Sequence, residues 1–181
     1  MQDYLGVEQT ESIQDRRYRE AAAAFGPALD RLARAYEFDP EKRRDLLQDI
    51  HVAVWRSFAS FDERCSVRTW VYRVAHNAAA SHVLRQRRTY SRLVSVEDLD
   101  GLPGPEAGEV AAGRQQALDR LLALIQHLKP LDRQVILSYL EGLDAAAIGE
   151  ITGISAGNAA TKIHRIKHLL ARQFHEGERH V

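Results

Sequence analysis

Apolar residues recur every three or four positions along most of the chain, which is the period of a helix that buries one face. This spacing places Tyr18 and Tyr36 on one side of a first predicted helix, residues 14–36. It also predicts a second helix that starts at about Glu41 and a third over about 66–88. Period-two alternation, the pattern of strands, is not what these long segments show. The sequence therefore predicts an all-α protein.

The stretch from Val94 to Gly113 interrupts this pattern, because it carries prolines, glycines and acidic residues with little apolar periodicity. Such a composition is typical of a linker. Beyond it the helical spacing returns. We expect a fourth helix that stops before Pro130, and a fifth that runs from Asp132 to about Gly142.

The sequence GEITGISAGNAATKIHRIK, from Gly149 to Lys167, contains three glycines within a helical pattern and ends in basic residues. We expect Asp144 to cap a short helix over residues 145–152, and Gly153 to supply a left-handed turn. Ser155 is then placed to cap a second helix that runs to about residue 174. The small Gly149 allows the two helices to cross closely, which is the geometry of a helix-turn-helix.

The formal net charge is zero, but the charges are segregated along the chain. Every charged residue in 64–95 is an arginine, and every charged residue in 96–113 is acidic. Arginines without nearby carboxylates repel one another unless an anion is bound, and the commonest such anion is a nucleic-acid backbone. This pattern favours DNA binding over the alternative, a plain helical bundle whose cations are only solvated.

Cys65 is the only cysteine, so neither an intramolecular disulfide nor a CxxC metal or redox motif is available. The sequence has no apolar run of the roughly 20 residues needed to span a bilayer, and its start lacks the apolar core of a signal peptide. We expect a cytosolic protein.

Two blocks resemble the extracytoplasmic-function (ECF) group of bacterial sigma factors, which belong to the sigma-70 superfamily. The block DLLQDIHVAVWRSFASFDERCSVRTWVYRVAHNAAASHVLRQRR, residues 45–88, is similar to region 2. The block LKPLDRQVILSYLEGLDAAAIGEITGISAGNAATKIHRIKHLL, residues 128–170, is similar to region 4. The resemblance implies a region 2 bundle of three to four helices at 14–92, an acidic flexible linker at 93–113 and a four-helix region 4 at 114–175.

The resemblance also implies which residues contact polymerase and the −10 element. In the family, the helix with the DLLQD pattern docks on the core RNA polymerase, and the residues that match it are Asp45, Gln48 and Asp49. The third helix and the loop before it open the −10 element and hold a flipped base, and Asn77 matches the base-reading asparagine. The predicted −10 contacts are Phe61, Arg64, Ser66, Arg73, Asn77, Arg85, Arg87 and Arg88.

The second helix of the helix-turn-helix reads the −35 element in the family. The matching exposed positions are Asn158, Thr161, Lys162 and Arg165. Many members have threonine and a basic residue where this chain has Asn158 and Ala160. These differences bear on which −35 sequence is read rather than on the fold.

Two aromatic residues of the third predicted helix have alternative interpretations. Trp70 and Tyr72 are chemically suited to stack on bases. However, Trp70 falls on the apolar stripe of its helix, which favours packing in the core. The linker likewise has two interpretations: its acidic chain either occupies a basic channel of the polymerase or serves only as a tether.

The partners implied by the resemblance are core RNA polymerase, promoter DNA and an anti-sigma factor. No catalytic motif, cofactor motif or metal site is predicted; His164 and His168, four residues apart, are interpreted as surface residues. The rival interpretations are a stand-alone helix-turn-helix regulator, which would bind a palindrome by itself, and a pure protein-interaction module. The second rival leaves the run of arginines unexplained.

Overall fold

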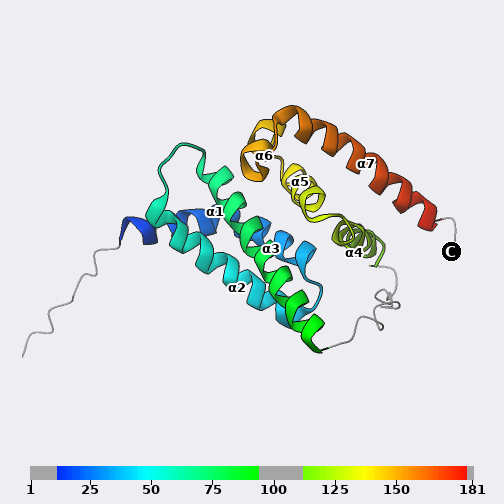
Figure 1. Cartoon of the computed structure of the whole chain (residues 1–181), viewed down its shortest axis with the longest axis horizontal. Coiled ribbons are helices and arrows are strands. Elements are labelled where there is room, and N and C mark those ends of the chain that lie inside the picture. Colours follow the sequence, from blue (N-terminus) through cyan, green and yellow to red (C-terminus); the bar gives the residue numbers. More distant parts are fainter. Residues whose placement is uncertain (1–11, 94–111, 179–181) are drawn as a thin grey trace, which may run out of the picture.

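The structure, a computed structural model, describes residues 12–93 and 112–178, with side chains for 12–86 and 116–172. The described residues form seven α-helices and one 3-10 turn, with no strand (Figure 1), so the all-α prediction is confirmed. The elements are α1 (Ile13–Tyr36), α2 (Pro40–Ser57), η1 (Phe58–Ser60), α3 (Val67–Leu93), α4 (Ala112–Gln126), α5 (Pro130–Leu140), α6 (Ala145–Thr152) and α7 (Ala156–Glu178).

Side-chain caps start several helices where the sequence predicted them. The Asp39 carboxylate accepts a hydrogen bond from the Glu41 backbone N–H at 2.9 Å, with Pro40 in the first helical position. Ser66 Oγ accepts from the Thr69 N–H at 3.0 Å, and the Asp144 carboxylate accepts from the N–H of the third residue of α6 at 2.8 Å. These bonds satisfy N–H groups that have no partner within the helix.

Some boundaries differ from the prediction. The fifth helix begins at Pro130 rather than Asp132, because proline lacks the N–H that the first helical position leaves unpaired and its fixed φ suits a helix start. The fourth helix ends at Gln126, and α3 and α7 run to Leu93 and Glu178, further than expected. The predicted loop between α2 and α3 contains the turn η1.

The helices form two bundles. The N-terminal bundle comprises α1, α2 and α3, and the C-terminal bundle comprises α4 to α7 (Figure 1). In the C-terminal bundle, Gly153 adopts φ of 76°, and this left-handed residue ends α6 as predicted. Gly149 faces the turn so closely that an added Cβ would lie 2.7 Å from the Ile154 carbonyl oxygen. The predicted helix-turn-helix is therefore present.

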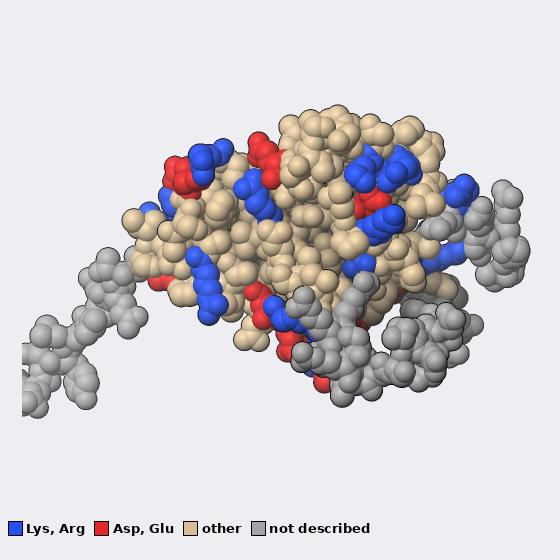
Figure 2. All heavy atoms as spheres, viewed as in Figure 1, with Lys and Arg blue, Asp and Glu red and all other residues tan. Residues whose placement is uncertain are grey.

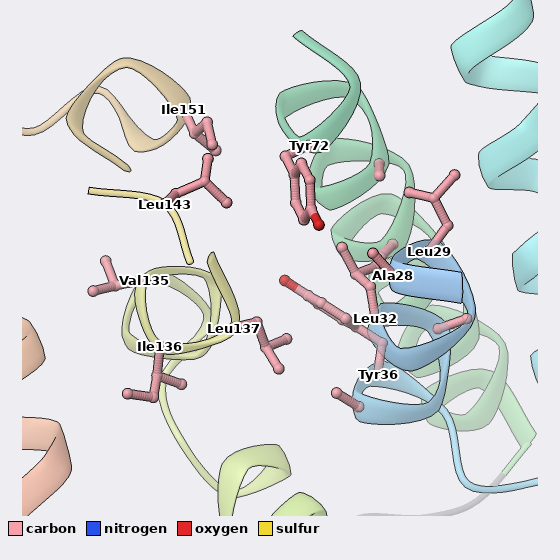
Figure 3. Packing of buried hydrophobic residues seen from close by; sticks show 14 of the residues in the cluster. Ala28, Leu29, Leu32, Tyr36, Tyr72, Val135, Ile136, Leu137, Leu143 and Ile151 are labelled. Carbon is pink, nitrogen blue, oxygen red and sulfur yellow. The ribbon is translucent and has the colours of Figure 1, made fainter. Parts of the chain in front are cut away.

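The two bundles pack against each other through one continuous apolar core, which the sequence did not predict. Helices α1 and α3 of the N-terminal bundle meet α4, α5 and α6 of the other. Figure 3 shows Tyr36 and Tyr72 on one side of this contact, with Leu137 and Leu143 on the other. All four residues are buried.

Candidate functional site

One face of α2 presents the residues predicted to bind polymerase. Asp45, Gln48 and Asp49 are all exposed, whereas Leu46 and Ile50 are fully buried against the other helices. A helix with 3.6 residues per turn separates these two sets onto opposite faces. The predicted polar face is thus exposed at the surface of the described chain.

A groove of about 410 Å³ separates this face from α3. Its lining includes Asp49 from α2 and Asn77, Ser81 and Arg85 from α3. Arg85 Nη2 lies 2.7 Å from Asp49 Oδ2, so a predicted DNA contact is paired with a predicted polymerase contact. Asn77 is exposed at the same groove. The structure therefore places one predicted polymerase contact, Asp49, beside two predicted −10 contacts, Asn77 and Arg85, along one seam.

The loop before α3 is held in place by aromatic packing. The Phe61 ring lies 5.9 Å from the ring of Phe58 and 5.3 Å from that of Trp70, centroid to centroid, and the Arg17 guanidinium lies 5.5 Å above it. The indole N–H of Trp70 donates to Ser57 Oγ at 2.9 Å. Trp70 therefore packs beneath this loop, and the sequence analysis favoured this packing role over base stacking.

The remaining predicted −10 residues have varied surroundings. Arg64 is exposed and pairs with Asp62, while Ser66 uses its hydroxyl to cap α3. The Arg73 guanidinium lies 6.0 Å from the centroid of the Trp70 ring, and its buried Nε has no hydrogen-bond partner among the described residues. Two further predicted contacts lie in α3 but outside the residues whose side chains are described, namely Arg87 and Arg88.

The four predicted −35 residues lie on α7. Asn158 and Thr161 are exposed near its start, and Thr161 Oγ donates to the Gly157 carbonyl at 3.0 Å. Lys162 Nζ lies 2.6 Å from Asp132 Oδ1, and Arg165 Nη2 lies 3.2 Å from Asp132 Oδ2. Figure 2 shows basic side chains gathered around an acidic one beside α7. Both cations of this face therefore share one carboxylate from α5.

The sequence did not indicate Asp132 as the partner of the two cations on α7. The Asp132 side chain is only 13% exposed and comes from the first turn of α5, about 30 positions before its partners. Nothing in the local pattern distinguishes it from an ordinary carboxylate near a helix start, where the helix dipole favours negative charge.

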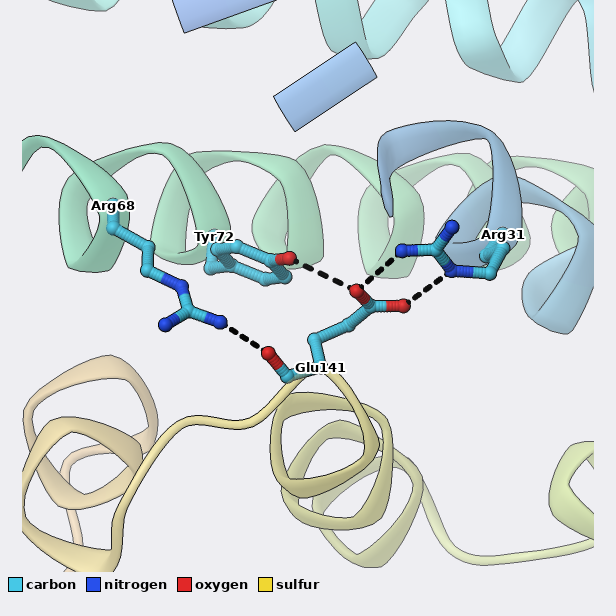
Figure 4. Close-up of polar contacts among 4 residues, drawn as sticks. All are labelled: Arg31, Arg68, Tyr72 and Glu141. Atoms are coloured by element: carbon cyan, nitrogen blue, oxygen red, sulfur yellow. Dashed lines mark hydrogen bonds and ion pairs between the residues drawn. The ribbon is translucent and has the colours of Figure 1, made fainter. Parts of the chain in front are cut away.

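A second polar contact that the sequence did not indicate lies between the bundles (Figure 4). Tyr72, considered as a stacking residue, is instead buried there, and burial together with the neighbouring Glu141 carboxylate raises the pKa of its hydroxyl to about 12. The Tyr72 hydroxyl donates to Glu141 Oε2 at 3.3 Å. The stacking role for Tyr72 is thus wrong for this arrangement, because its ring is covered by the C-terminal bundle.

The described helices include none that is both long and apolar enough to cross a membrane. Within the described residues no three potential metal ligands come together, although the His164 and His168 rings lie 4.4 Å apart, centroid to centroid.

Comparison with known proteins accounts for both bundles. Residues 22–89 match the family model of Sigma-70 region 2, and residues 118–170 match that of Sigma-70, region 4. The chain is 32% identical over 124 residues to RNA polymerase sigma factor CarQ of Myxococcus xanthus, covering 67% of this chain and 68% of CarQ. The chain belongs to the sigma-70 family.

Within this family the sigma factor is similar to the ECF type. It is 27% identical over 142 residues to ECF RNA polymerase sigma factor SigW of Bacillus subtilis, covering 73% of this chain and 75% of SigW. Its fold resembles the sigma factor RpoE, solved with the anti-sigma factor NepR from Bartonella quintana, with a TM-score of 0.65 at 19% identity, covering 89% of this chain and 98% of that one. It is an alternative sigma factor that directs transcription initiation, and the stand-alone regulator is not favoured.

Proposed function

We propose that this sigma factor binds core RNA polymerase through Asp45, Gln48 and Asp49, reads the −10 element with α3 and reads the −35 element with α7. The observation that carries the proposal is the seam between α2 and α3, where Asp49 and Arg85 are paired beside the exposed Asn77. Polymerase and melted DNA would meet at this seam. Binding of polymerase would therefore bring the opened DNA strand to Asn77. Within this scheme the chain is an initiation factor acting in the cytoplasm, without enzymatic activity of its own.

Different chemistry in α3 supports different roles in the −10 contact. The Asn77 side-chain amide donates and accepts hydrogen bonds at once, which suits a base edge. Arg85, with 62% of its side chain exposed, offers a charge that suits a phosphate. Arg87 and Arg88 follow in the same helix and are proposed as further phosphate contacts. Phe61, supported by Trp70, lies in the loop that would flank the opened strand.

Region 4 presents a helix start and a basic face to DNA. Asn158 is exposed in the first turn of α7, where a recognition helix enters the major groove. Lys162 and Arg165 are proposed as phosphate contacts, since charge rather than shape is what they offer. Asp132 then acts as a positioning residue that holds both cationic groups against α5 until DNA competes for them.

An anti-sigma factor is the further proposed partner. RpoE, whose fold this chain shares, was solved with such a protein. An inhibitor would cover the exposed faces of α2 and α7. The first is the proposed contact for polymerase, and the second is the proposed contact for −35 DNA.

The proposal is tested with a promoter library in which every −10 and −35 base is varied, transcribed by the holoenzyme at two salt concentrations. Asn77→Ala is expected to relax discrimination at one −10 position by about 1–3 kcal/mol, the range for a good direct base contact. Arg85→Ala is expected to weaken all promoters alike and to flatten the salt dependence by about one unit of slope.

Two outcomes would contradict this assignment. A uniform loss for Asn77→Ala, with unchanged base preference, would make that residue structural. Binding of a palindromic site by the free protein, unaffected by added polymerase, would instead favour the stand-alone regulator.

The Asp132 assignment has its own test. Asp132→Asn keeps the side-chain volume but removes the carboxylate charge, so Lys162 and Arg165 become free to meet phosphates. We expect tighter binding of the holoenzyme to DNA of scrambled −35 sequence, a salt slope steeper by about one unit, and a smaller preference for the cognate −35. Glu150→Gln, which removes one exposed charge from α6, is the matched control. Equal effects of both variants would show that only net charge matters.

A further inference from the structure

The first turns of α1 lie beside the loop that leads into α3, and the match to Sigma-70 region 2 does not include them. That match begins at residue 22, whereas α1 begins at Ile13. The loop comprises residues 61–66, between η1 and α3. We call it the −10 loop, because the proposed function places it against the opened strand. Contacts from the start of α1 to this loop therefore come from residues that the family match does not cover.

The start of α1 is fixed to the end of α2 by hydrogen bonds. The indole N–H of Trp55, in the last turn of α2, donates to Asp15 Oδ1 at 2.8 Å, and the Gln14 side-chain amide donates to the Trp55 carbonyl oxygen at 2.8 Å. Further along α1, the Tyr18 hydroxyl lies 3.0 Å from His51 Nδ1. These contacts hold the first turns of α1 against α2, the helix that leads through η1 into the −10 loop.

Arg17 extends from these turns of α1 to two residues of the −10 loop. Its guanidinium lies 5.5 Å from the centroid of the Phe61 ring and is paired with the Glu63 carboxylate. The face of an aromatic ring attracts a cation, and a carboxylate accepts a charge-assisted hydrogen bond from one. One side chain on a fixed helix therefore restrains both an aromatic and an acidic residue of the loop.

Glu63 has a backbone conformation that needs such a restraint. Its φ is 62°, and in the described ranges it is the one residue other than glycine with a positive φ. In this left-handed region the Cβ crowds the following carbonyl oxygen, so a residue with a side chain stays there only where surrounding contacts hold it. Without the pair to Arg17, Glu63 would be free to return to a negative φ, and the course of the chain between Phe61 and Ser66 would change.

The pair with Arg17 also balances a charge. The −10 loop contains two acids, and Asp62 is paired with Arg64 while Glu63 is paired with Arg17. A carboxylate without such a partner would repel the phosphates of a nearby strand. Arg17 thus fixes the shape of the loop and lowers its negative charge, and the two effects predict different behaviour for Glu63→Gln.

We propose that Arg17 is a positioning residue for −10 reading, which holds the −10 loop in the shape that receives the opened strand. This inference rests on the proposed function of α3 and of the loop. The pair is partly exposed, with 31% of the Arg17 side chain and 68% of the Glu63 side chain accessible, so it contributes little to global stability. Opening of a loop requires far less free energy than unfolding, and the same contact therefore decides how often the loop is ordered.

The order of the loop is measured by EPR in the full-length chain, with a nitroxide on Cys65, the only cysteine. Arg17→Met keeps a long apolar side chain but loses the charge. Its ratio of mobile to restrained label is expected to rise about fivefold, the combined effect of an exposed ion pair and a cation–π contact. Arg17→Lys keeps the charge and should stay within about twofold of wild type. Arg16→Met, at an exposed position of the same helix, is the matched control and should match wild type.

Holoenzyme binding to single-stranded DNA supplies the second readout, the affinity for the −10 sequence divided by that for a scrambled sequence. In Arg17→Met this ratio should fall with the ordered fraction of the loop, by up to about fivefold. Binding to core polymerase and preference for the −35 element should not change. Glu63→Gln removes the negative charge but also the pair, so a positioning role predicts a lowered ratio. Charge balance alone predicts tighter binding of both sequences and an unchanged ratio.

The outcomes separate this inference from the proposed function. A loop that is equally ordered in wild type and Arg17→Met would overturn the positioning role. An unchanged ratio in Arg17→Met, beside a lowered ratio in Asn77→Ala, would overturn it as well, because base reading would then work without the restraint. If neither variant altered the ratio, the proposed −10 site itself would be wrong, and the EPR comparison would still decide whether Arg17 restrains the loop.

Discussion

Gly149→Ala is expected to lower the free energy of unfolding by about 1–3 kcal/mol, the usual cost of forcing an extra methyl into a packed site. The new Cβ would lie 2.7 Å from the Ile154 carbonyl oxygen and 3.5 Å from the Ala156 backbone nitrogen. Both atoms belong to the backbone of the turn and the start of α7, so neither can rotate away. The better helix propensity of alanine, about 1 kcal/mol, offsets only part of this cost.

Urea unfolding of Gly149→Ala measures this effect, and Gly157→Ala is the matched control. An added Cβ at Gly157 meets nothing within 4 Å, and this residue also lies within a helix, α7. Gly157→Ala should therefore be neutral or stabilising by up to about 1 kcal/mol. If both variants unfold at the same urea concentration as wild type, the close crossing of α6 and α7 is not a constraint on this fold. In Gly149→Ala the added Cβ is also expected to tilt α7, and this tilt should reduce transcription from promoters that depend on the −35 element.

The helix-turn-helix was predictable because its determinants are local. Asp144 caps a helix eight residues long, Gly153 supplies the turn, and each lies within a few residues of the groups it affects. Apolar spacing then selects the buried face of α7, where Ile163 and Ile166 pack inward. The same apolar spacing also identifies the exposed face of α7. The surface positions of the predicted −35 residues were therefore predictable as well.

The interface between the bundles was not predictable in this way. Ser138 lies 62 positions from His76, and Glu141 lies 110 positions from Arg31. In the sequence Glu141 is simply an acid before a glycine at a helix end, and His76 is one polar residue on a helix rich in alanine. Only the packing of α5 against α1 and α3 gives these residues their partners, and no local pattern encodes that packing.

The arginine-rich stretch also differs from its sequence interpretation. Its arginines have no carboxylate among themselves, which suggested that a bound anion was needed to balance them. The structure supplies carboxylates from outside the stretch: Asp62 pairs with Arg64, and Asp49 of α2 pairs with Arg85. The argument for DNA binding thus rests on the family and on the exposure of these groups rather than on unbalanced charge.

Replacement of Asp45, Gln48 and Asp49 together by alanine is expected to abolish most binding to core polymerase while leaving the fold nearly unchanged. All three side chains are exposed, and exposed polar substitutions usually alter stability by no more than about 0.5 kcal/mol each. Loss of the Asp49 pair with Arg85 adds little, because both side chains are at least half exposed. A titration of labelled sigma factor with core polymerase, beside thermal unfolding, separates binding from stability.

The matched control for this variant removes two carboxylates elsewhere, by Glu20→Ala and Glu150→Ala on the exposed faces of α1 and α6. If charge alone attracted polymerase, the control would weaken binding as much as the triple variant. If the α2 face is the docking surface, the control binds as wild type does and the triple variant does not. If the triple variant binds normally, the docking surface lies elsewhere than on α2.

Since Asp49 also restrains Arg85, the single variant Asp49→Asn should bind free DNA more tightly even as it binds polymerase less well.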